Sequence, residues 1–407
     1  MEKFTVERLG MEGDGIISSL SGAIYAPYTL PGENVQGQPD GSRLTHIEVL
    51  GASEFRVKPV CRHFGRCGGC SLQHASDAFL ASWKQDVVVR ALAAQGLDAM
   101  FRPAVSSPER SRRRATFTGR RTRKTEQIGF FESGSEVLVD LAECHILRPS
   151  LMAARPALAA ILRAGGSRNG VLRLTVTDSL EGLDVAVSGG KPLDIVLRGT
   201  LAGLAEAHDL ARLTWDEDQI ALRRRPVQRF GRALVAPPPG GFLQATAEGE
   251  AALLAAVVDA VGPAKRVADL FAGCGTFALP LAERAEVLAV EGEAAMVAAM
   301  DRGWREAAGL HKVDSVARDL FRRPMLAHEM KNFDAVVIDP PRAGAAAQMM
   351  ELAQSAVKVI AAVSCNPITF ARDAKTLCDA GFSLDWVQVV DQFRWTGHVE
   401  LVARFSR

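Results

Sequence analysis

The chain has 407 residues, of which 48% are hydrophobic and 23% charged, and its formal net charge is +1. This composition is typical of a globular protein, and the length suggests two or three domains. No apolar run reaches the roughly 18 residues that a membrane span needs, and the first ten residues lack the apolar core of a signal peptide. We therefore expect a cytoplasmic protein with no membrane segment.

Residues 1 to 50 contain short apolar stretches separated by glycine and proline. Strands are predicted at 4–10, 13–20, 21–27, 33–38 and 45–51. Short strands with such punctuation favour a small β-barrel. The alternative is a sheet that extends the following domain.

Residues 51–235 begin with a cysteine cluster. Cys61, Cys67 and Cys70 lie in CRHFGRCGGC, and Cys144 follows in ECHIL. Seven cysteines in a chain expected in the cytoplasm favour metal binding or catalysis over disulfides. On stereochemical grounds, four thiolates suit zinc and a four-iron, four-sulfur cluster equally well.

The remainder of this segment mixes helix and strand. Apolar spacing predicts a helix over 79–94, and two strand pairs are predicted, 129–133 with 136–141 and 171–178 with 183–189. Nine basic residues against one acid lie between Arg102 and Lys124, and five arginines lie between Arg223 and Arg232. Such clusters suit phosphate contacts, although a solvated hairpin face explains the charge equally well. Residues 236–241, APPPGG, are a predicted linker.

From Phe242 onward, apolar strands alternate with helices. The strands are predicted at 266–271, 286–291, 334–339, 357–364, 386–391 and 399–405. Their continuous apolar character favours a parallel sheet covered on both faces. Ligands of such a sheet bind beyond the carboxyl ends of its strands, so residues at those ends are candidates for a site.

A glycine-rich turn follows the first of these strands, in DLFAGCGTFALPLA from Asp269. Gly273 and Gly275 allow a ligand to approach the backbone, but this signal alone is shared with dinucleotide-binding folds. Glu291 ends the next strand, where a carboxylate can bind ribose hydroxyls, and Asp319 lies where adenine is expected. The arrangement is rich in acidic residues and does not demand a pyrophosphate, so it suits S-adenosylmethionine, which is cationic and not phosphorylated, better than NAD. Solvated strand ends are the alternative for both carboxylates.

Two later motifs carry candidate catalytic groups. Cys365 lies at a strand end in SCNP, and Glu400 lies in HVE at the start of the last predicted strand. Methylation of uracil carbon-5 requires a thiolate that adds to carbon-6 and a base that removes the carbon-5 proton. Arg342 ends DPPR, where enzymes that methylate amino groups usually have an aromatic residue. A buried core thiol and a surface carboxylate are the alternatives, and the role of His398 stays open.

Together these motifs resemble the family of RNA 5-methyluridine methyltransferases over nearly the whole chain. The resemblance implies a catalytic nucleophile at Cys365 and a proton acceptor at Glu400. It implies a four-iron, four-sulfur cluster rather than zinc on the four clustered cysteines, Cys61, Cys67, Cys70 and Cys144. The S-adenosylmethionine contacts that we expect are Gln244, Phe271, Gly273, Glu291, Asp319 and Asp339.

The resemblance also implies an α/β protein of three domains. These are a TRAM-like RNA-binding β-barrel at 1–50, a central α/β domain with the cluster and the basic segment at 51–235, and a Rossmann-like class I methyltransferase domain at 236–407. A TRAM-like segment together with a cysteine cluster favours structured RNA, 23S ribosomal RNA in particular, as the substrate of a monomeric enzyme. Methylation of tRNA uridine-54, a non-catalytic RNA-binding protein and an iron–sulfur redox protein are the alternatives.

Overall fold

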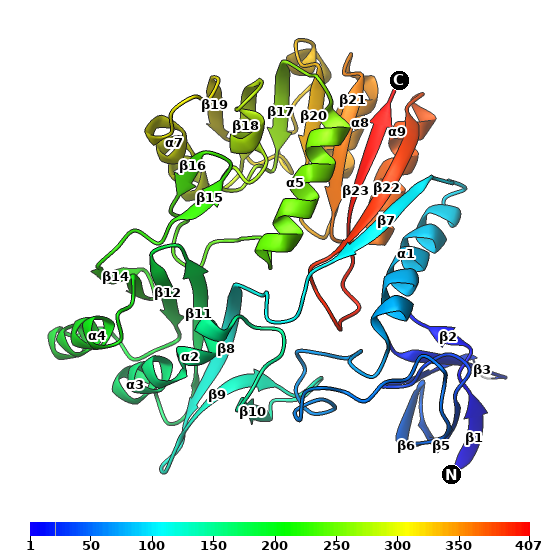
Figure 1. Cartoon of the computed structure of the whole chain (residues 1–407), viewed down its shortest axis with the longest axis vertical. Helices are drawn as coiled ribbons and strands as arrows, with labels where there is room; N and C mark the ends of the chain where they lie inside the picture. Colours follow the sequence, from blue (N-terminus) through cyan, green and yellow to red (C-terminus); the bar gives the residue numbers. More distant parts are fainter. Residues whose placement is uncertain (21) are drawn as a thin grey trace.

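The N-terminal part of the computed structural model, which describes residues 1–20 and 22–407, is a curled six-stranded sheet (Figure 1). In spatial order its strands are β1 (Glu2–Thr5), β5 (Asn34–Asp40), β6 (Arg43–Gly51), β4 (Gly22–Ala26), β3 (Gly15–Ser19) and β2 (Arg8–Leu9). The two edge strands, β1 and β2, are consecutive in the sequence. Between them, Val6 N donates to Glu33 O at 2.9 Å and Glu7 N donates to Ile16 O at 2.9 Å, so one segment contacts both ends of the sheet.

The central part is a seven-stranded sheet covered by helices. Its strands, in spatial order, are β10 (Leu138–Asp140), β9 (Glu126–Phe131), β8 (Arg114–Arg121), β11 (Val171–Ser179), β12 (Gly182–Ser188), β13 (Arg212–Trp215) and β14 (Asp218–Leu222). The helices are α2 (Pro149–Ala153), α3 (Arg155–Gly165) and α4 (Ile195–Ala207). Both predicted strand pairs are confirmed as the antiparallel pairs β9–β10 and β11–β12. A small pair, β15 (Gln228–Phe230) and β16 (Ala233–Val235), leads to the C-terminal part.

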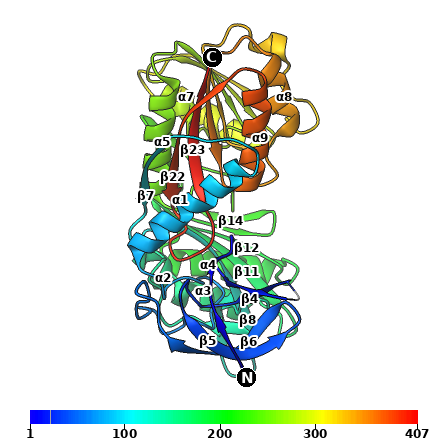
Figure 2. The same cartoon turned by 90° about the vertical axis from the view of Figure 1, so that its right-hand side faces the viewer.

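The C-terminal part is an eight-stranded sheet with helices on both faces (Figures 1 and 2). Its strands, in spatial order, are β19 (Val313–Ala317), β18 (Glu286–Glu291), β17 (Arg266–Leu270), β20 (Ala335–Ile338), β21 (Val359–Ser364), β23 (Glu400–Ser406), β22 (Ser383–Asp391) and β7 (Phe101–Ser106). Its helices are α5 (Ala247–Val261), α6 (Ala278–Leu281), α7 (Ala294–Glu306), a 3-10 turn at Ala327–Met330, α8 (Ala346–Gln354) and α9 (Pro367–Asp379). Among the described helices, none has the length and apolar character that crossing a bilayer requires.

The expectation of a wholly parallel sheet is wrong for one strand. β23 runs antiparallel to both β21 and β22. The physical reason is the short connection 392–399 between β22 and β23, because a parallel crossover needs a dozen or more residues. The reversal brings the first residue of β23 to the edge where the other strands end.

The first helix and strand after the cysteine cluster belong to this C-terminal sheet. The sequence pattern predicts them as part of the central domain, but β7 pairs in parallel with β22, with Phe101 opposite Val387. The helix before it, α1 (Asp77–Ala93), packs on α9 and β22, and Figures 1 and 2 both show α1 and β7 beside the last strands. The buried side chains Trp83, Val87 and Val88 of α1 join the core of that sheet.

Candidate active site

The predicted cofactor and catalytic residues all meet at one end of the C-terminal sheet. They line a single cavity of about 570 Å³. The eight residues are Gln244, Phe271, Gly273, Glu291, Asp319, Asp339, Cys365 and Glu400. Because β17 to β21 are parallel, the residues that follow them reach the same edge, and the structure brings the predicted site residues together there.

The register of two antiparallel strands brings the two candidate catalytic residues together. Ser364 at the end of β21 is paired with Leu401 of β23. Cys365 therefore follows β21 at the point where Glu400 begins β23. Asn366 caps α9 by accepting from Ile368 N at 3.1 Å, and its side chain donates to Arg342 O at 3.0 Å. This turn fixes Cys365 at the cavity edge.

Three residues of the glycine-rich turn have a positive φ. Gly273 and Gly275 have φ values of 56° and 92°, and Phe271 adopts φ 62°, which is uncommon and strained for a bulky residue. Gly273 N donates to the Glu291 carboxylate at 2.9 Å. The Phe271 ring lies 5.4 Å from that of Phe321, so an apolar wall adjoins the carboxylates.

Carboxylates dominate the electrostatics of the cavity. Burial raises the pKa of Asp339 to about 7. Burial, with a further contribution from the charge of Asp339, raises the pKa of Glu400 to about 8. Burial and then the charge of Glu400 raise the pKa of the Cys365 thiol to about 11. This cavity disfavours added negative charge and suits a cationic ligand.

A buried amide that the sequence motifs did not indicate connects two of these residues. Gln392 Nε2 donates to Gln244 Oε1 at 2.5 Å and also to the carboxylate of Glu400. Its Oε1 accepts from Ala245 N at 2.8 Å. The only available signal was its position just after a predicted strand, because the pairing with Gln244 spans 148 residues.

A buried ion pair holds the beginning of the same loop. Lys84 Nζ of α1 lies 2.6 Å from Asp391 Oδ1 and donates to Phe393 O at 3.1 Å. The Lys84 side chain is fully buried. Asp391 also accepts from Phe393 N at 3.0 Å, so α1 fixes the end of β22 beside the cavity.

The rest of the loop 392–399 contacts the N-terminal half of the chain. Trp395 O accepts hydrogen bonds from Ser71 N at 2.9 Å and Leu72 N at 3.0 Å. Gly397 lies against the backbone of Glu12, so close that an added Cβ would be 2.8 Å from Glu12 O. His398 lines the cavity, and burial together with the charge of Arg342 lowers its pKa.

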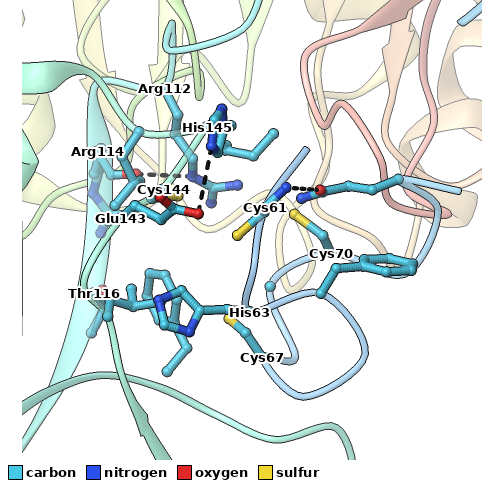
Figure 3. Close-up of a pocket in the computed structure, with 18 residues that line it drawn as sticks. Cys61, His63, Cys67, Cys70, Arg112, Arg114, Thr116, Glu143, Cys144 and His145 are labelled. Atoms are coloured by element: carbon cyan, nitrogen blue, oxygen red, sulfur yellow. Dashed lines mark hydrogen bonds and ion pairs between the residues drawn. The ribbon is translucent and has the colours of Figure 1, made fainter. Parts of the chain in front are cut away.

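The four clustered cysteines line a second cavity of about 290 Å³. Figure 3 shows Cys61, Cys67 and Cys70 on one loop and Cys144 on the facing segment. Burial raises the pKa of Cys70 to about 12 and also raises the pKa of Cys67 and Cys144. Across residues 1–20 and 22–407, no three or more His, Cys, Asp or Glu side chains have an arrangement that could hold a metal ion.

The loop that carries three of these cysteines is fixed to strand β9. Cys67 forms a β-bridge with Glu132, and Gly68 N donates to Phe131 O at 2.8 Å. A Cβ at Gly68 would lie 2.8 Å from Phe131 O, whereas a Cβ at Gly69 would meet Cys67 Sγ at an ordinary 3.5 Å. Gly68 is therefore required for the close approach of the loop to the strand.

Several arginines of the basic segment 102–124 are paired within the protein, and the prediction that this segment contacts RNA now concerns its exposed residues, Arg110, Arg123 and Lys124. Arg113 is 4% exposed, donates to Gln244 O at 3.1 Å and pairs with Glu250 at 2.5 Å. Arg114 donates to Gly240 O at 2.8 Å. These arginines lie where the central and C-terminal sheets meet. Their planar guanidinium groups donate to buried carbonyl and carboxylate groups there.

The second basic cluster is also largely paired. Arg223 and Arg224 share the Asp209 carboxylate, and Arg225 pairs with Glu306. Arg232 lies 3.6 Å from the Glu283 carboxylate. Counting arginines in the sequence therefore overstates the positive charge available to phosphates.

The sheet topology and the carboxylate-lined cavity at its edge define a Rossmann-like α/β enzyme. Residues 231–406 match the family model described as tRNA (Uracil-5-)-methyltransferase. An uncharacterised RNA methyltransferase of Brucella suis biovar 1 (strain 1330) is 44% identical over 407 residues, covering 100% of this chain and 98% of its own. The 23S rRNA (uracil(1939)-C(5))-methyltransferase RlmD of Shewanella piezotolerans is 33% identical, covering 98% of this chain and 94% of its own. The chain belongs to the RNA uracil-C5 methyltransferase family.

One solved structure has the same fold over almost the entire chain. The tRNA (uracil-54, C5)-methyltransferase of Pyrococcus abyssi, solved with S-adenosyl-L-homocysteine, superposes with a TM-score of 0.78 and covers 99% of both chains. Its sequence identity is 23%, so the likeness concerns the fold. The resemblance expected from the sequence motifs is confirmed.

Proposed function

We propose that this protein transfers the methyl group of S-adenosylmethionine to carbon-5 of one uridine in 23S ribosomal RNA. The observation that carries the proposal is the meeting of Cys365 and Glu400 in the cavity that Gln244, Glu291 and Asp339 also line. A thiol and a base on one side and ribose-binding carboxylates on the other are what carbon-5 methylation requires. The full-length likeness to a 23S rRNA enzyme supports the choice of RNA.

In this proposal one side of the cavity binds S-adenosylmethionine and the other side carries the catalytic residues. Glu291 is the last residue of β18, where its carboxylate can accept from both ribose hydroxyls, and Asp319 follows β19 beside the Phe271 and Phe321 rings, where adenine would lie. Gln244 and Asp339 would hold the amino acid end. Bound S-adenosylmethionine supplies the methyl group and a positive charge that the carboxylates favour.

The reaction follows from the positions of Cys365 and Glu400. Cys365 Sγ, deprotonated, would add to carbon-6 of the uracil, and carbon-5 would then bond to the methyl carbon as that carbon's bond to the sulfonium sulfur breaks and S-adenosylhomocysteine leaves. Glu400 next removes the carbon-5 proton, the carbon-5 to carbon-6 double bond re-forms, and the thiolate leaves. Arg342 lowers the pKa of Cys365, in opposition to burial and to Glu400, and thereby favours the thiolate.

Two variants separate these steps. Cys365→Ala should form neither adduct nor product, because it lacks the nucleophile, while it still binds S-adenosylmethionine. Glu400→Gln should methylate and then stay attached to the RNA, because nothing removes the carbon-5 proton. A denaturing gel of labelled RNA checks both, and 5-fluorouridine RNA should trap the unchanged enzyme in the same way. Ordinary methylation by Cys365→Ala would show that another group is the nucleophile.

The target RNA is tested separately. Mapping of 5-methyluridine in total RNA from cells with and without the gene should show the loss of one site in 23S rRNA. Purified enzyme should then methylate a 23S rRNA fragment that carries that uridine and leave unmodified tRNA unchanged. A loss confined to tRNA position 54 would keep the chemistry and replace the substrate.

We further propose that a four-iron, four-sulfur cluster occupies the cysteine cavity, as the resemblance of the cysteine motif to the family implies. Among the described residues the side chains form no site of three or more metal ligands, for zinc or for a cluster, so this choice rests on the motif and not on the geometry. A four-iron cluster binds each cysteine through a different iron, and the four thiols line one cavity. Cys61, Cys67, Cys70 and Cys144 would hold it, and it would join the loop to the segment after β10.

A further inference from the structure

The amide of Gln392 lies between the cofactor side and the base side of the cavity. It is 2% exposed, and both of its polar atoms are used. One Nε2 group donates to Gln244 Oε1 and to Glu400 Oε2, and Oε1 accepts from Ala245 N. A single amide therefore connects an expected cofactor contact with the proposed base.

These contacts determine the orientation of the neighbouring amide. Gln244 has an oxygen and a nitrogen that can exchange places by a flip of the amide. Because Gln392 donates to Oε1, the Gln244 Nε2 faces Asp339, with 3.4 Å between Nε2 and Oδ2. In this orientation, Gln244 presents a donor to the cofactor side of the cavity.

Gln392 is itself held rigidly. Thr246 caps α5 by accepting from Gly249 N at 2.9 Å, and an added Cβ at Gly249 would lie 2.7 Å from Gln392 Cβ. The preceding residue, Asp391, is fixed by the buried pair with Lys84. The first turn of α5 and helix α1 thus hold the amide from two sides.

We propose that Gln392 is a positioning residue that orients Gln244 toward the methyl donor and stabilises the ionised form of Glu400. The inference rests on the proposed function, because it assigns Glu400 as the base. Through one side chain, the orientation of the methyl-donor contact and the basicity of the proton acceptor depend on each other.

The charged groups that face Glu400 set the sign of the pH effect. Asp339 after β20 and Asp391 at the end of β22 disfavour its negative form, and Lys84 of α1 favours it. Cys365 after β21 faces it as well, and there the charge of Glu400 raises the pKa of the thiol. The hydrogen bond from Gln392 also favours the carboxylate. Loss of that bond raises the pKa of Glu400 further, so that a higher pH is needed for Glu400 to act as a base.

The test is Gln392→Met, which keeps the length of the side chain and removes both donors. Release of methylated RNA from the covalent adduct is timed on denaturing gels between pH 6 and pH 10. The pH of half-maximal release should rise by about one unit, and S-adenosylmethionine affinity should fall several-fold. Gln392→Glu, which keeps the shape of the side chain and adds a carboxylate, should shift release in the same direction.

The matched control is Gln388→Met, on strand β22, which directly precedes Gln392. Gln388 donates to Pro103 O at 3.1 Å on the exposed side, away from the cavity. Its pH profile should equal that of the unchanged enzyme. An unshifted profile for both Gln392 variants, or equal shifts for Gln392→Met and Gln388→Met, would overturn the inference.

Failure of the proposed function would give a different result. If the unchanged enzyme formed no adduct with 5-fluorouridine RNA, the assignment of Cys365 and Glu400 would fail before Gln392 was tested. If the unchanged enzyme formed the adduct with uridine RNA and released methylated RNA, while Cys365→Ala formed no adduct, the assignment of Cys365 would stand. The comparison of Gln392→Met with Gln388→Met would then decide the inference alone.

Discussion

Glu400 combines nearly complete burial with a proposed role, as the base, that requires a negative charge. It is 6% exposed, and Asp339 adds to the cost of its ionisation. A raised pKa makes it a stronger base, which favours removal of the carbon-5 proton near neutral pH. The same environment makes the ionised carboxylate a source of instability in the folded protein.

Glu400→Gln should therefore stabilise the protein at alkaline pH. The pKa of Glu400 is raised from 4.5 to about 8 in the folded state, so between these values the folded protein holds a proton that the unfolded chain has released. The contribution of the Glu400 carboxyl to the free energy of unfolding is greatest below pH 4.5 and falls as the pH rises towards about 8. Urea unfolding at pH 6, 7, 8 and 9 should show that the free energy of unfolding of the variant, relative to that of the unchanged protein, increases with pH by up to a few kcal/mol. A constant difference across this range would contradict the assignment.

Helix α1 acts on the active site through a single buried ion pair. Removing one partner of such a pair leaves an uncompensated charge, at a cost of about 3–5 kcal/mol. Lys84→Met should therefore destabilise the protein strongly, because Asp391 stays buried. Lys84→Met combined with Asp391→Asn should cost less than the sum of the two single changes. Urea unfolding of the four proteins measures the coupling, and strict additivity would show that the pair contributes nothing.

The cysteine loop offers a matched pair of glycines. Gly68→Ala would place a methyl group 2.8 Å from Phe131 O, whereas Gly69→Ala makes only an ordinary contact with Cys67. We expect Gly68→Ala to lose most of its bound iron and its broad absorbance near 400 nm during anaerobic purification, while Gly69→Ala keeps both. Equal iron in the two variants would show that the loop does not need β9 to hold the cluster. Unchanged protein that binds zinc and no iron would refute the cluster itself.

Motif residues could be predicted from sequence because their neighbours are local. Glu291 ends β18, Asp339 and Cys365 directly follow β20 and β21, and Gly273 lies in the turn after β17. The parallel sheet brings such positions together without further information. The partners of Lys84 lie about 307 residues away, and no local pattern indicates such a contact. Burial of Arg113 could not be predicted for the same reason, because its carboxylate partner Glu250 lies 137 residues further on.

The basic segment is exposed at Arg110 and at the tip of the β8–β9 hairpin. Arg123 and Lys124 are exposed there, unlike Arg113. If this tip binds RNA phosphates, the double change of Arg123 and Lys124 to alanine should reduce the slope of log affinity against log salt by roughly 0.7–0.9 for each phosphate that is no longer bound. The control removes two equally exposed charges, Arg302 and Arg305 of α7, and should leave the slope unchanged. Filter binding at several salt concentrations measures both, and equal slopes would exclude the hairpin tip.

The pairing of β7 with β22 has a consequence for synthesis on the ribosome. Phe101 and its partner Val387 are separated by 387 − 101 = 286 residues. At about 5–20 residues per second, β7 and the apolar face of α1 wait roughly 15–60 s for the strand that covers them. During that interval the edge of β7 is unpaired in the nascent chain, and Lys84, which is buried in the folded protein, is exposed to solvent. Loss of chaperones, or slower translation after β7, should therefore lower the fraction of the protein that is recovered folded.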